Sequence, residues 1–398
     1  MDDNQIIGEL KNQGIDLVCS IPCDKAKGLF YRIPNEFRHI GLTREEDGVG
    51  ISAGAYLAGA RPAIAIQSSG LGNMLNAILS LTVTFGLPLP ILASWRGCDG
   101  EKIPAQIPFN RPLPAILAAA GIACTVVRGP DAAREIGNAV AAAYRDHAPH
   151  VILLRPECIE EANGSAPAGI PVVHPFSVTY TRNWRAPVMT RYEAIRAIAG
   201  IVKDEILVAN IGVPSKELYA ARDRPENFYM LGSYTQASAI GLGIATARPD
   251  RRAIVIDGDG SLLGSAILPV IAASGRDNLT IVCLDNGVFG STGNQPRPGQ
   301  DTADLALMAL GAGFTRSLTV HEPWELEAAL AAKTGDGPSF IHVRIRPGNS
   351  DVPNILLSPA QIRDRFMAAL KKPESKVVVG NAIGKPARAK NINNCEHM

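Results

Sequence analysis

The chain has 398 residues, of which 46% are hydrophobic, and its formal net charge is +1. This length is enough for two domains with separate cores, and the balanced charge argues against a nucleic-acid or membrane partner. Apolar runs stay below the roughly 20 residues that a membrane-spanning helix needs. The segment Met1–Gln5 has neither the basic nor the apolar part of a secretory signal, so we expect a cytoplasmic protein.

Cysteine spacing narrows the range of cofactors. The seven cysteines form no CxxC pair, so we expect neither a zinc site nor an iron–sulfur cluster. Cys19 and Cys283 lie inside apolar, strand-like runs and are expected to be buried thiols. An odd number of cysteines without a pairing pattern fits a reducing compartment.

Short apolar segments alternate with alanine-rich helical segments over the first 160 residues. A parallel sheet covered by helices produces this alternation. We predict six strands here: Asp16–Pro22, His39–Thr43, Ala63–Ser69, Leu89–Trp95, Ala123–Arg128 and His150–Arg155.

The composition changes after residue 157 and then returns to the same alternation. Pro, Gly, Asn and Ser without a sustained period predict a linker, which we place at 161–187. Thr190 is a suitable N-cap for a helix over Arg191–Ile201, and Ser358–Lys371 is expected to form a closing helix. The predicted strands between them are Ile206–Ile211, Asn227–Leu231, Ala253–Asp257, Leu279–Asp285, Phe314–Val320 and Phe340–Ile345.

These patterns predict an α/β protein of two domains, 1–160 and 188–372, each a parallel sheet covered by helices on both faces. The polar, basic segment 373–398 is expected to be a disordered tail.

The segment 254–295 carries the most informative motif. One predicted strand ends in Gly258-Asp259-Gly260-Ser261, and the next ends in Asn286-Gly287. We expect the two strands to be neighbours, so that Asp259 and Asn286 meet at the carboxyl edge of the sheet, where ligands bind. A carboxylate, an amide oxygen and the backbone carbonyl of Val288 suit Mg²⁺, while Gly258 and Gly260 let the backbone approach a phosphate. Taken singly, an Asp-Gly or Asn-Gly pair is usually only a turn.

The motif from Gly258 to Asn286 resembles the diphosphate signature of thiamine-diphosphate enzymes, a GDG followed about two dozen residues later by an Asn. The resemblance implies two thiamine-diphosphate-binding-fold domains, with thiamine diphosphate and Mg²⁺ as cofactors. It also implies that Asp259 and Asn286 bind the metal through their side chains and Val288 through its carbonyl. The cofactor-binding residues it implies are Ser69, Gly70, Asn73, Gly232, Ser233, Tyr234, Gly258, Asp259, Gly260, Ser261, Asn286 and Val288.

A catalytic glutamate is expected in the segment Thr43–Asp47, which follows a predicted strand and precedes a helix over Gly48–Ala60. Thr43 and Glu46 have the spacing of a capping box, so we assign Glu46 to the helix end. In thiamine-diphosphate enzymes the proton-relay glutamate lies nine residues before the glycine of an Ala-Gly pair. That glycine is Gly54 here, and by this resemblance Glu45 is the relay.

The chain has no room for the third domain that most thiamine-dependent decarboxylases carry. In this, and in the segments Gln67–Asn73, Ser94–Gly97, Glu101–Pro108 and Leu284–Gln295, it resembles the sulfopyruvate decarboxylases, with the alpha and beta subunits fused, and the related phosphonopyruvate decarboxylases. The resemblance implies decarboxylation of 3-sulfopyruvate to sulfoacetaldehyde and CO₂, a step of coenzyme M biosynthesis. It also implies a homodimer or larger assembly with the active site at a subunit interface. Arg96, Lys102 and Gln106 are candidates for binding the anionic 2-oxo acid, although a solvated surface loop is an equal alternative for the last two.

Two departures from the family pattern bear on activity. Tyr234-Thr235 replaces the Met-Gly of relatives, and Gly264-Ser265 replaces an expected Met-Asn. They leave open a phosphonopyruvate decarboxylase, a thiamine-dependent carboligase and a catalytically silent paralogue that only binds the cofactor.

Overall fold

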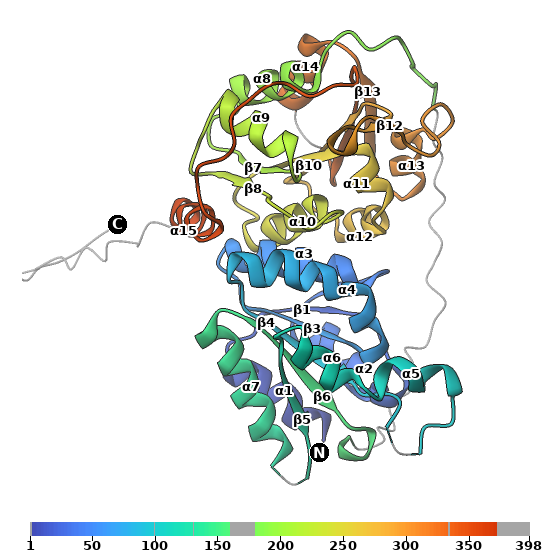
Figure 1. The fold of residues 1–398 in the computed structure, drawn as a ribbon, viewed down its shortest axis with the longest axis vertical. Coiled ribbons are helices and arrows are strands. Elements are labelled where there is room, and N and C mark those ends of the chain that lie inside the picture. The colour runs from blue at the N-terminus through green and yellow to red at the C-terminus, as the bar shows by residue number, and fades with distance from the viewer. Residues whose placement is uncertain (1, 99, 130, 160–179, 333–334, 372–398) are drawn as a thin grey trace, which may run out of the picture.

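The computed structural model describes residues 2–98, 100–129, 131–159, 180–332 and 335–371. Each half of the chain forms a six-stranded, fully parallel sheet (Figure 1). The first sheet consists of β1 Leu17–Ser20, β2 Arg38–Gly41, β3 Pro62–Gln67, β4 Leu89–Ser94, β5 Ala123–Val127 and β6 Pro149–Leu154. The second consists of β7 Ile206–Ala209, β8 Asn227–Tyr229, β9 Ala253–Gly258, β10 Leu279–Asp285, β13 Arg316–Val320 and β14 Ser339–Arg344.

The two sheets have the same topology. The strand order is β2-β1-β3-β4-β6-β5 in the first sheet, and β8-β7-β9-β10-β14-β13 in the second. The two halves therefore repeat one architecture, with equivalent strand ends at the carboxyl edge of each sheet. All twelve predicted strands are present, each within two residues of its predicted ends.

Helices cover both faces of each sheet. Consecutive residues of a strand in the first sheet point to opposite faces. Cys19 belongs to the apolar cluster that contains α3 (Glu45–Leu57), and Val18 belongs to the one that contains α7 (Ala132–Asp146). In the second half, α10 (Ala237–Ala247) and α12 (Ile267–Ser274) lie on the side facing the first half. Helices α8 (Arg191–Ile201), α9 (Val213–Ala221) and α14 (Pro323–Ala331) lie on the opposite side (Figure 1). The helices of the first half are α1 Asp3–Asn12, α2 Lys27–Glu36, α3 Glu45–Leu57, α4 Leu71–Ala77, α5 Ile107–Asn110, α6 Leu113–Ala119 and α7 Ala132–Asp146. Those of the second half are α8 Arg191–Ile201, α9 Val213–Ala221, α10 Ala237–Ala247, α11 Asp259–Leu263, α12 Ile267–Ser274, α13 Leu305–Gly311, α14 Pro323–Ala331 and α15 Pro359–Leu370.

The first and last helices of the second half begin with side-chain caps. Thr190 and Ser358 cap α8 and α15, each in a capping box, as the sequence predicted for Thr190. Cys19 and Cys283 are buried, as expected.

Most of the predicted linker 161–187 and all of the predicted tail 373–398 lie outside the described residues, so the proposed domain boundaries stay predictions. No helix in the described ranges has the length and hydropathy needed to cross a bilayer.

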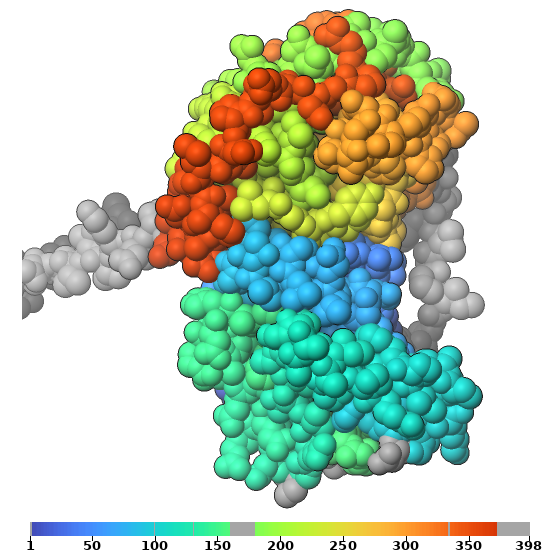
Figure 2. All heavy atoms as spheres, viewed as in Figure 1, coloured from blue at the N-terminus to red at the C-terminus, as the bar shows by residue number. Residues whose placement is uncertain are grey.

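The two halves pack against each other through α3 and α10 (Figure 2). Glycines allow this close approach, because a Cβ on Gly54 would lie 2.0 Å from the carbonyl oxygen of Ile240. A Cβ on Gly243 would likewise lie 2.0 Å from the carbonyl oxygen of Ile51. One apolar cluster consequently runs from the first sheet through both helices into the second sheet.

Asp47, in the first turn of α3, is fully buried between the halves. Burial, together with the charge of Glu46, raises the pKa of Asp47 to about 7. The folded protein therefore binds a proton at Asp47 that the unfolded chain has released, so this group lowers stability as the pH rises from about 4 to 7. We expect Asp47→Asn to raise the free energy of unfolding by about 2 kcal/mol at pH 8 and to change it little near pH 4. Urea unfolding followed by circular dichroism at several pH values measures this difference.

The exposed Asp131 provides the matched control, since Asp131→Asn makes the same chemical change on the surface. This control should leave the free energy of unfolding unchanged within about 0.5 kcal/mol. A pH-independent effect of Asp47→Asn would contradict the assignment of the pH dependence to this carboxyl group.

Candidate active site

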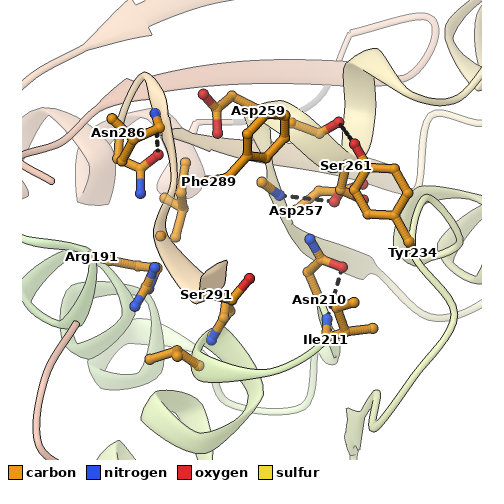
Figure 3. Close-up of a pocket in the computed structure, with 17 residues that line it drawn as sticks. Arg191, Asn210, Ile211, Tyr234, Asp257, Asp259, Ser261, Asn286, Phe289 and Ser291 are labelled. Carbon is orange, nitrogen blue, oxygen red and sulfur yellow. Dashed lines mark hydrogen bonds between the residues drawn. The ribbon is translucent and has the colours of Figure 1, made fainter. Parts of the chain in front are cut away.

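A pocket of about 100 Å³ lies at the carboxyl edge of the second sheet. Its walls come from the ends of β7, β9 and β10 and from the loop that follows β10 (Figure 3). The strand order reverses between β7 and β9, so the pocket lies at the topological switch point where ligands bind in open parallel sheets. The lining residues are Arg191, Asn210, Ile211, Val213, Pro214, Tyr234, Asp257, Gly258, Asp259, Gly260, Ser261, Leu284, Asn286, Val288, Phe289, Gly290 and Ser291.

The predicted metal ligands Asp259, Asn286 and Val288 all line this pocket. Strands β9 and β10 are hydrogen-bonded neighbours, as the sequence predicted, and the backbone N–H of Gly287 donates to Asp259 Oδ2 over 3.2 Å. Val288 pairs in a short hairpin with Pro296, which has no backbone N–H to donate to the Val288 carbonyl. The pocket therefore offers a carboxylate, an amide and a backbone oxygen, a ligand set that suits Mg²⁺.

A buried arginine that the sequence did not single out holds the carboxylate of Asp259. Arg297 Nε lies 2.5 Å from Asp259 Oδ2, and Arg297 Nη2 lies 3.2 Å from Asp285 Oδ1. His342 Nε2 lies 2.8 Å from the other oxygen of Asp285. The hydrogen bonds from Arg297 Nε and from the Gly287 N–H both fall on Asp259 Oδ2. No described residue donates a hydrogen bond to Oδ1, which remains for a ligand in the pocket. The side chain of Arg297 thus orients the carboxylate as well as balancing its charge.

Burial and charge act in opposite ways on these two carboxyl groups. Burial, with the charge of Asp285, raises the pKa of Asp259. Burial also opposes ionisation of Asp285, but the hydrogen bond with His342 holds the pKa of Asp285 below its usual value. A cation bound at Asp259 would favour the ionised carboxylate there.

The end of β9 and the first turn of α11 are shaped for a ligand that approaches the backbone closely. A Cβ on Gly260 would lie 2.7 Å from the ring of Phe289, and one on Gly258 would lie 3.3 Å from the side-chain amide of Asn210. Ser233 is buried, and its hydroxyl has no hydrogen-bond partner within the described part of the chain. Ser233 does not line the pocket, however, so the fit of a phosphate here rests on Gly258 and Gly260.

Asn210 and Arg191 are pocket residues that the sequence analysis missed. Asn210 directly follows β7, so its position at a strand end at the same sheet edge was an available signal. Arg191 gave no such signal, because its position depends on the bidentate ion pair with buried Glu217 and on a contact with Asn349.

The predicted relay, Glu45, lies at the first position of α3. Asn73 Nδ2 donates to Glu45 Oε2 over 3.0 Å, so two residues predicted for the pyrimidine side lie together. The carboxyl group lies over Gly70, where a Cβ would be 2.5 Å from Glu45 Cγ and 2.6 Å from Oε1. Glu45 does not line the pocket that contains Asp259.

The capping box predicted for Thr43 and Glu46 is wrong. Helix α3 begins at Glu45, its N-cap is Arg44, and no side chain caps it. The Thr43 hydroxyl donates instead to the carbonyl of Ala266 in the other half, and Glu46 pairs with Arg44 at 2.9 Å. Packing between the halves therefore outweighs the local capping pattern.

The three candidate substrate residues differ in exposure and in the hydrogen bonds that their side chains already make. Arg96 is buried, and its guanidinium group donates to both carboxylate oxygens of Glu101 and to Asp24. Lys102 is exposed beside these residues in a second pocket, of about 410 Å³. Gln106 Oε1 accepts a hydrogen bond from Ser69 Oγ over 2.6 Å, which links it to the predicted pyrimidine side.

Family models match both halves of the chain. The model described as the N-terminal TPP binding domain of thiamine pyrophosphate enzymes matches residues 3–110, and the C-terminal TPP binding domain matches residues 211–343. The chain belongs to the thiamine pyrophosphate enzymes. Its cofactors are accordingly thiamine diphosphate and a divalent metal such as Mg²⁺, which the ligand set around Asp259 fits.

Full-length relatives place the chain among the decarboxylases of this family. It is 42% identical over 378 residues to sulfopyruvate decarboxylase of Methanosarcina acetivorans, which covers 92% of this chain and 97% of that protein. It is 33% identical over 385 residues to phosphonopyruvate decarboxylase of Streptomyces viridochromogenes, over 92% of this chain and 94% of that one. The chain is therefore an enzyme of the carboxy-lyase class.

Separate subunits of relatives match parts of the chain. The sulfopyruvate decarboxylase subunit beta of Methanothermobacter thermautotrophicus is 44% identical over 184 residues, which is 46% of this chain and 96% of that subunit. The subunit alpha of Methanocaldococcus jannaschii is 48% identical over 108 residues, which is 27% of this chain and 64% of that subunit. This agrees with a fusion of two subunits.

A solved structure agrees with the fold. Benzoylformate decarboxylase from Polynucleobacter necessarius superposes with a TM-score of 0.68 at 13% identity, covering 87% of this chain and 99% of that one. Both halves therefore have the thiamine-diphosphate-binding fold that the sequence predicted.

Proposed function

We propose that this enzyme decarboxylates 3-sulfopyruvate to sulfoacetaldehyde and CO₂, and so takes part in coenzyme M biosynthesis. The observation that carries the proposal is the 42% identity, over nearly the whole of both chains, to a protein named sulfopyruvate decarboxylase. Identity to the phosphonopyruvate decarboxylases is 31–33% over similar lengths. The higher identity to the sulfopyruvate enzyme favours sulfopyruvate as the substrate, and phosphonopyruvate is the second candidate.

In the proposed reaction, the protein binds, orients and shields the reacting groups. Bound thiamine diphosphate supplies the electron sink that decarboxylation requires. Asp259, Asn286 and the carbonyl of Val288 would hold the metal. Because Arg297 binds Oδ2 of Asp259, the other oxygen, Oδ1, would be the one that faces the ion. Glu45, oriented by Asn73, would hold the proton that the cofactor's aminopyrimidine exchanges at N1′.

The anionic end of the substrate would be bound at the carboxyl edge of the first sheet. Arg96 is already neutralised by Glu101 and Asp24, so it would contribute mainly by holding the 96–106 loop in place. Lys102 is the exposed cation on that loop, and Gln106 can offer its amide N–H groups. A sulfonate or phosphonate is well served by such a cation and amide pair.

We further propose a cytoplasmic homodimer, or a larger assembly, whose active site lies between subunits. The pocket around Asp259 is lined only by residues 191–291, and Glu45 is outside it. Two inactive variants, Glu45→Gln and Asp259→Ala, test this when they are co-expressed. Random dimers would regain about a quarter of wild-type activity, because one site per mixed dimer is intact. Absence of any recovery, although mixed dimers form, would contradict a shared site.

The assay that tests the function is CO₂ release from sulfopyruvate and from phosphonopyruvate, with Mg²⁺ and thiamine diphosphate present. We expect kcat/KM to be higher for sulfopyruvate by at least about 10-fold, a difference of roughly 1.4 kcal/mol in transition-state binding. A preference for phosphonopyruvate would transfer the proposal to that substrate. Tight cofactor binding with no CO₂ from either acid would show a silent paralogue, and a condensed product with an added aldehyde would show a carboligase.

A further inference from the structure

Tyr234 links two parts of the cofactor pocket. It lies in the loop Gly232–Thr235, lines the pocket with Asp259, and is 43% exposed. Its hydroxyl donates to the carbonyl of Gly260, in the first turn of α11 (Figure 3). The tyrosine therefore bridges the loop and the turn that carries the predicted metal ligand.

Gly264 provides the space that the tyrosine ring occupies. A Cβ at this position would lie 2.9 Å from Cε1 and 3.0 Å from Oη of Tyr234, and 3.0 Å from Cγ2 of Thr235. The backbone of Gly264 has an ordinary right-handed helical conformation, with φ −78° and ψ −11°. The backbone thus gives no reason for glycine here, and the contact with Tyr234 and Thr235 gives a steric one.

The loop itself has a strained backbone that tertiary contacts must hold. Ser233 and Thr235 have φ values of 71° and 77°, in the left-handed region that side chains disfavour. For a β-branched residue such as Thr235 this conformation is a genuine outlier. Gln236 connects the loop to the first half of the chain: its Nε2 donates to Thr235 Oγ1, and its Oε1 accepts the N–H of Gly50 in α3.

We propose that Tyr234 and Gly264 act as a coupled pair that positions the cofactor-binding turn at Gly260. The ring of Tyr234 fills the volume that Gly264 leaves empty, and its hydroxyl fixes the carbonyl of Gly260 and hence the turn that presents Asp259. The inference rests on the proposed function in one respect, namely that this pocket binds the diphosphate of thiamine diphosphate.

A double-mutant cycle on the full-length protein tests the pair. The variants are Gly264→Ala, Tyr234→Leu and the double substitution, and the readouts are the Kd of thiamine diphosphate at fixed Mg²⁺ and the melting temperature without ligand. We expect Gly264→Ala to raise Kd by about 10-fold in the wild-type background. In the Tyr234→Leu background it should raise Kd by less, about 3-fold, because the smaller side chain removes the contacts with Cε1 and Oη of Tyr234 and leaves only the contact with Thr235 Cγ2. Gly200→Ala is the matched control, since a Cβ there meets nothing within 4 Å, and it should leave Kd unchanged.

The hydroxyl is tested separately by Tyr234→Phe, which retains the ring. We expect a rise in Kd of about 5-fold, as for one lost hydrogen bond, with little change in melting temperature. Equal effects of Gly264→Ala in both backgrounds, or an unchanged Kd for Tyr234→Phe, would overturn the corresponding half of the proposal. A wild-type protein that binds the cofactor without decarboxylating either acid would remove the proposed reaction and leave this proposal standing. A wild-type protein that does not bind the cofactor would overturn both.

Discussion

Glu45→Gln should lower the turnover of the enzyme by about 10²- to 10⁴-fold, the range typical for a lost acid–base group. Glutamine has the shape of glutamate and can still lie over Gly70 beside Asn73, but its amide cannot relay a proton. The Kd of thiamine diphosphate should therefore change only a few-fold. Steady-state CO₂ release and calorimetric cofactor binding on the same preparation measure the two effects.

Glu46→Gln is the matched control for this prediction. Glu46 follows Glu45 directly in the chain, yet its carboxylate pairs with Arg44. We expect this variant to keep turnover within a few-fold of wild type. Undiminished turnover in Glu45→Gln, or an equal loss in both variants, would remove Glu45 from its assigned role.

Asp259→Ala should abolish the Mg²⁺-dependent part of cofactor binding and raise the Kd of thiamine diphosphate by about 100-fold or more. Groups that merely support a metal ligand typically change metal affinity 10- to 100-fold, so a direct ligand should exceed that range. The variant also leaves Arg297 with the carboxylate of Asp285 and the carbonyl of Pro298 as partners. Titration of cofactor at several Mg²⁺ concentrations separates lost metal binding from a general loss of affinity.

Asp301→Ala provides the control, since Asp301 is an exposed acidic residue just beyond the same hairpin. It should bind cofactor and metal as wild type does. If Asp259→Ala kept a normal Mg²⁺ dependence, the metal would have to bind elsewhere.

Strand positions and the metal motif were predictable because both depend on local patterns. Fully buried parallel strands such as β10 are continuous apolar runs, so the sequence marks where they end. Asp259 and Asn286 follow two of these ends, and parallel neighbours place their carboxyl ends at one edge. The chemistry of the site could therefore be inferred from the sequence before its geometry was known.

The features that the sequence could not give depend on contacts between distant segments. Arg297 reaches Asp259 only because the hairpin of β11 Val288–Phe289 and β12 Gln295–Pro296 turns the chain back toward the site. Thr43 fails to cap α3 because Ala266, more than 200 residues later, accepts its hydroxyl. A local pattern contains no information about such partners.

Departures from a family pattern are also hard to judge one at a time. In sequence, Tyr234 and Gly264 each suggested a lost function, whereas in the fold the second makes room for the first. Similarly, Arg96 looked like a free cation, but its donors are already bound to Glu101 and Asp24. In both cases the physical meaning of the residue comes from its neighbour.

We propose that one divalent ion, held by Asp259 and Asn286, anchors the cofactor. The most direct test is a crystal structure of the enzyme with thiamine diphosphate and Mn²⁺, which replaces Mg²⁺ and is located by its anomalous scattering. We expect a single strong peak between Asp259 Oδ1, the Asn286 side-chain oxygen and the Val288 carbonyl, in contact with the diphosphate. A cofactor bound in the pocket with its ion ligated by other residues would contradict the claim.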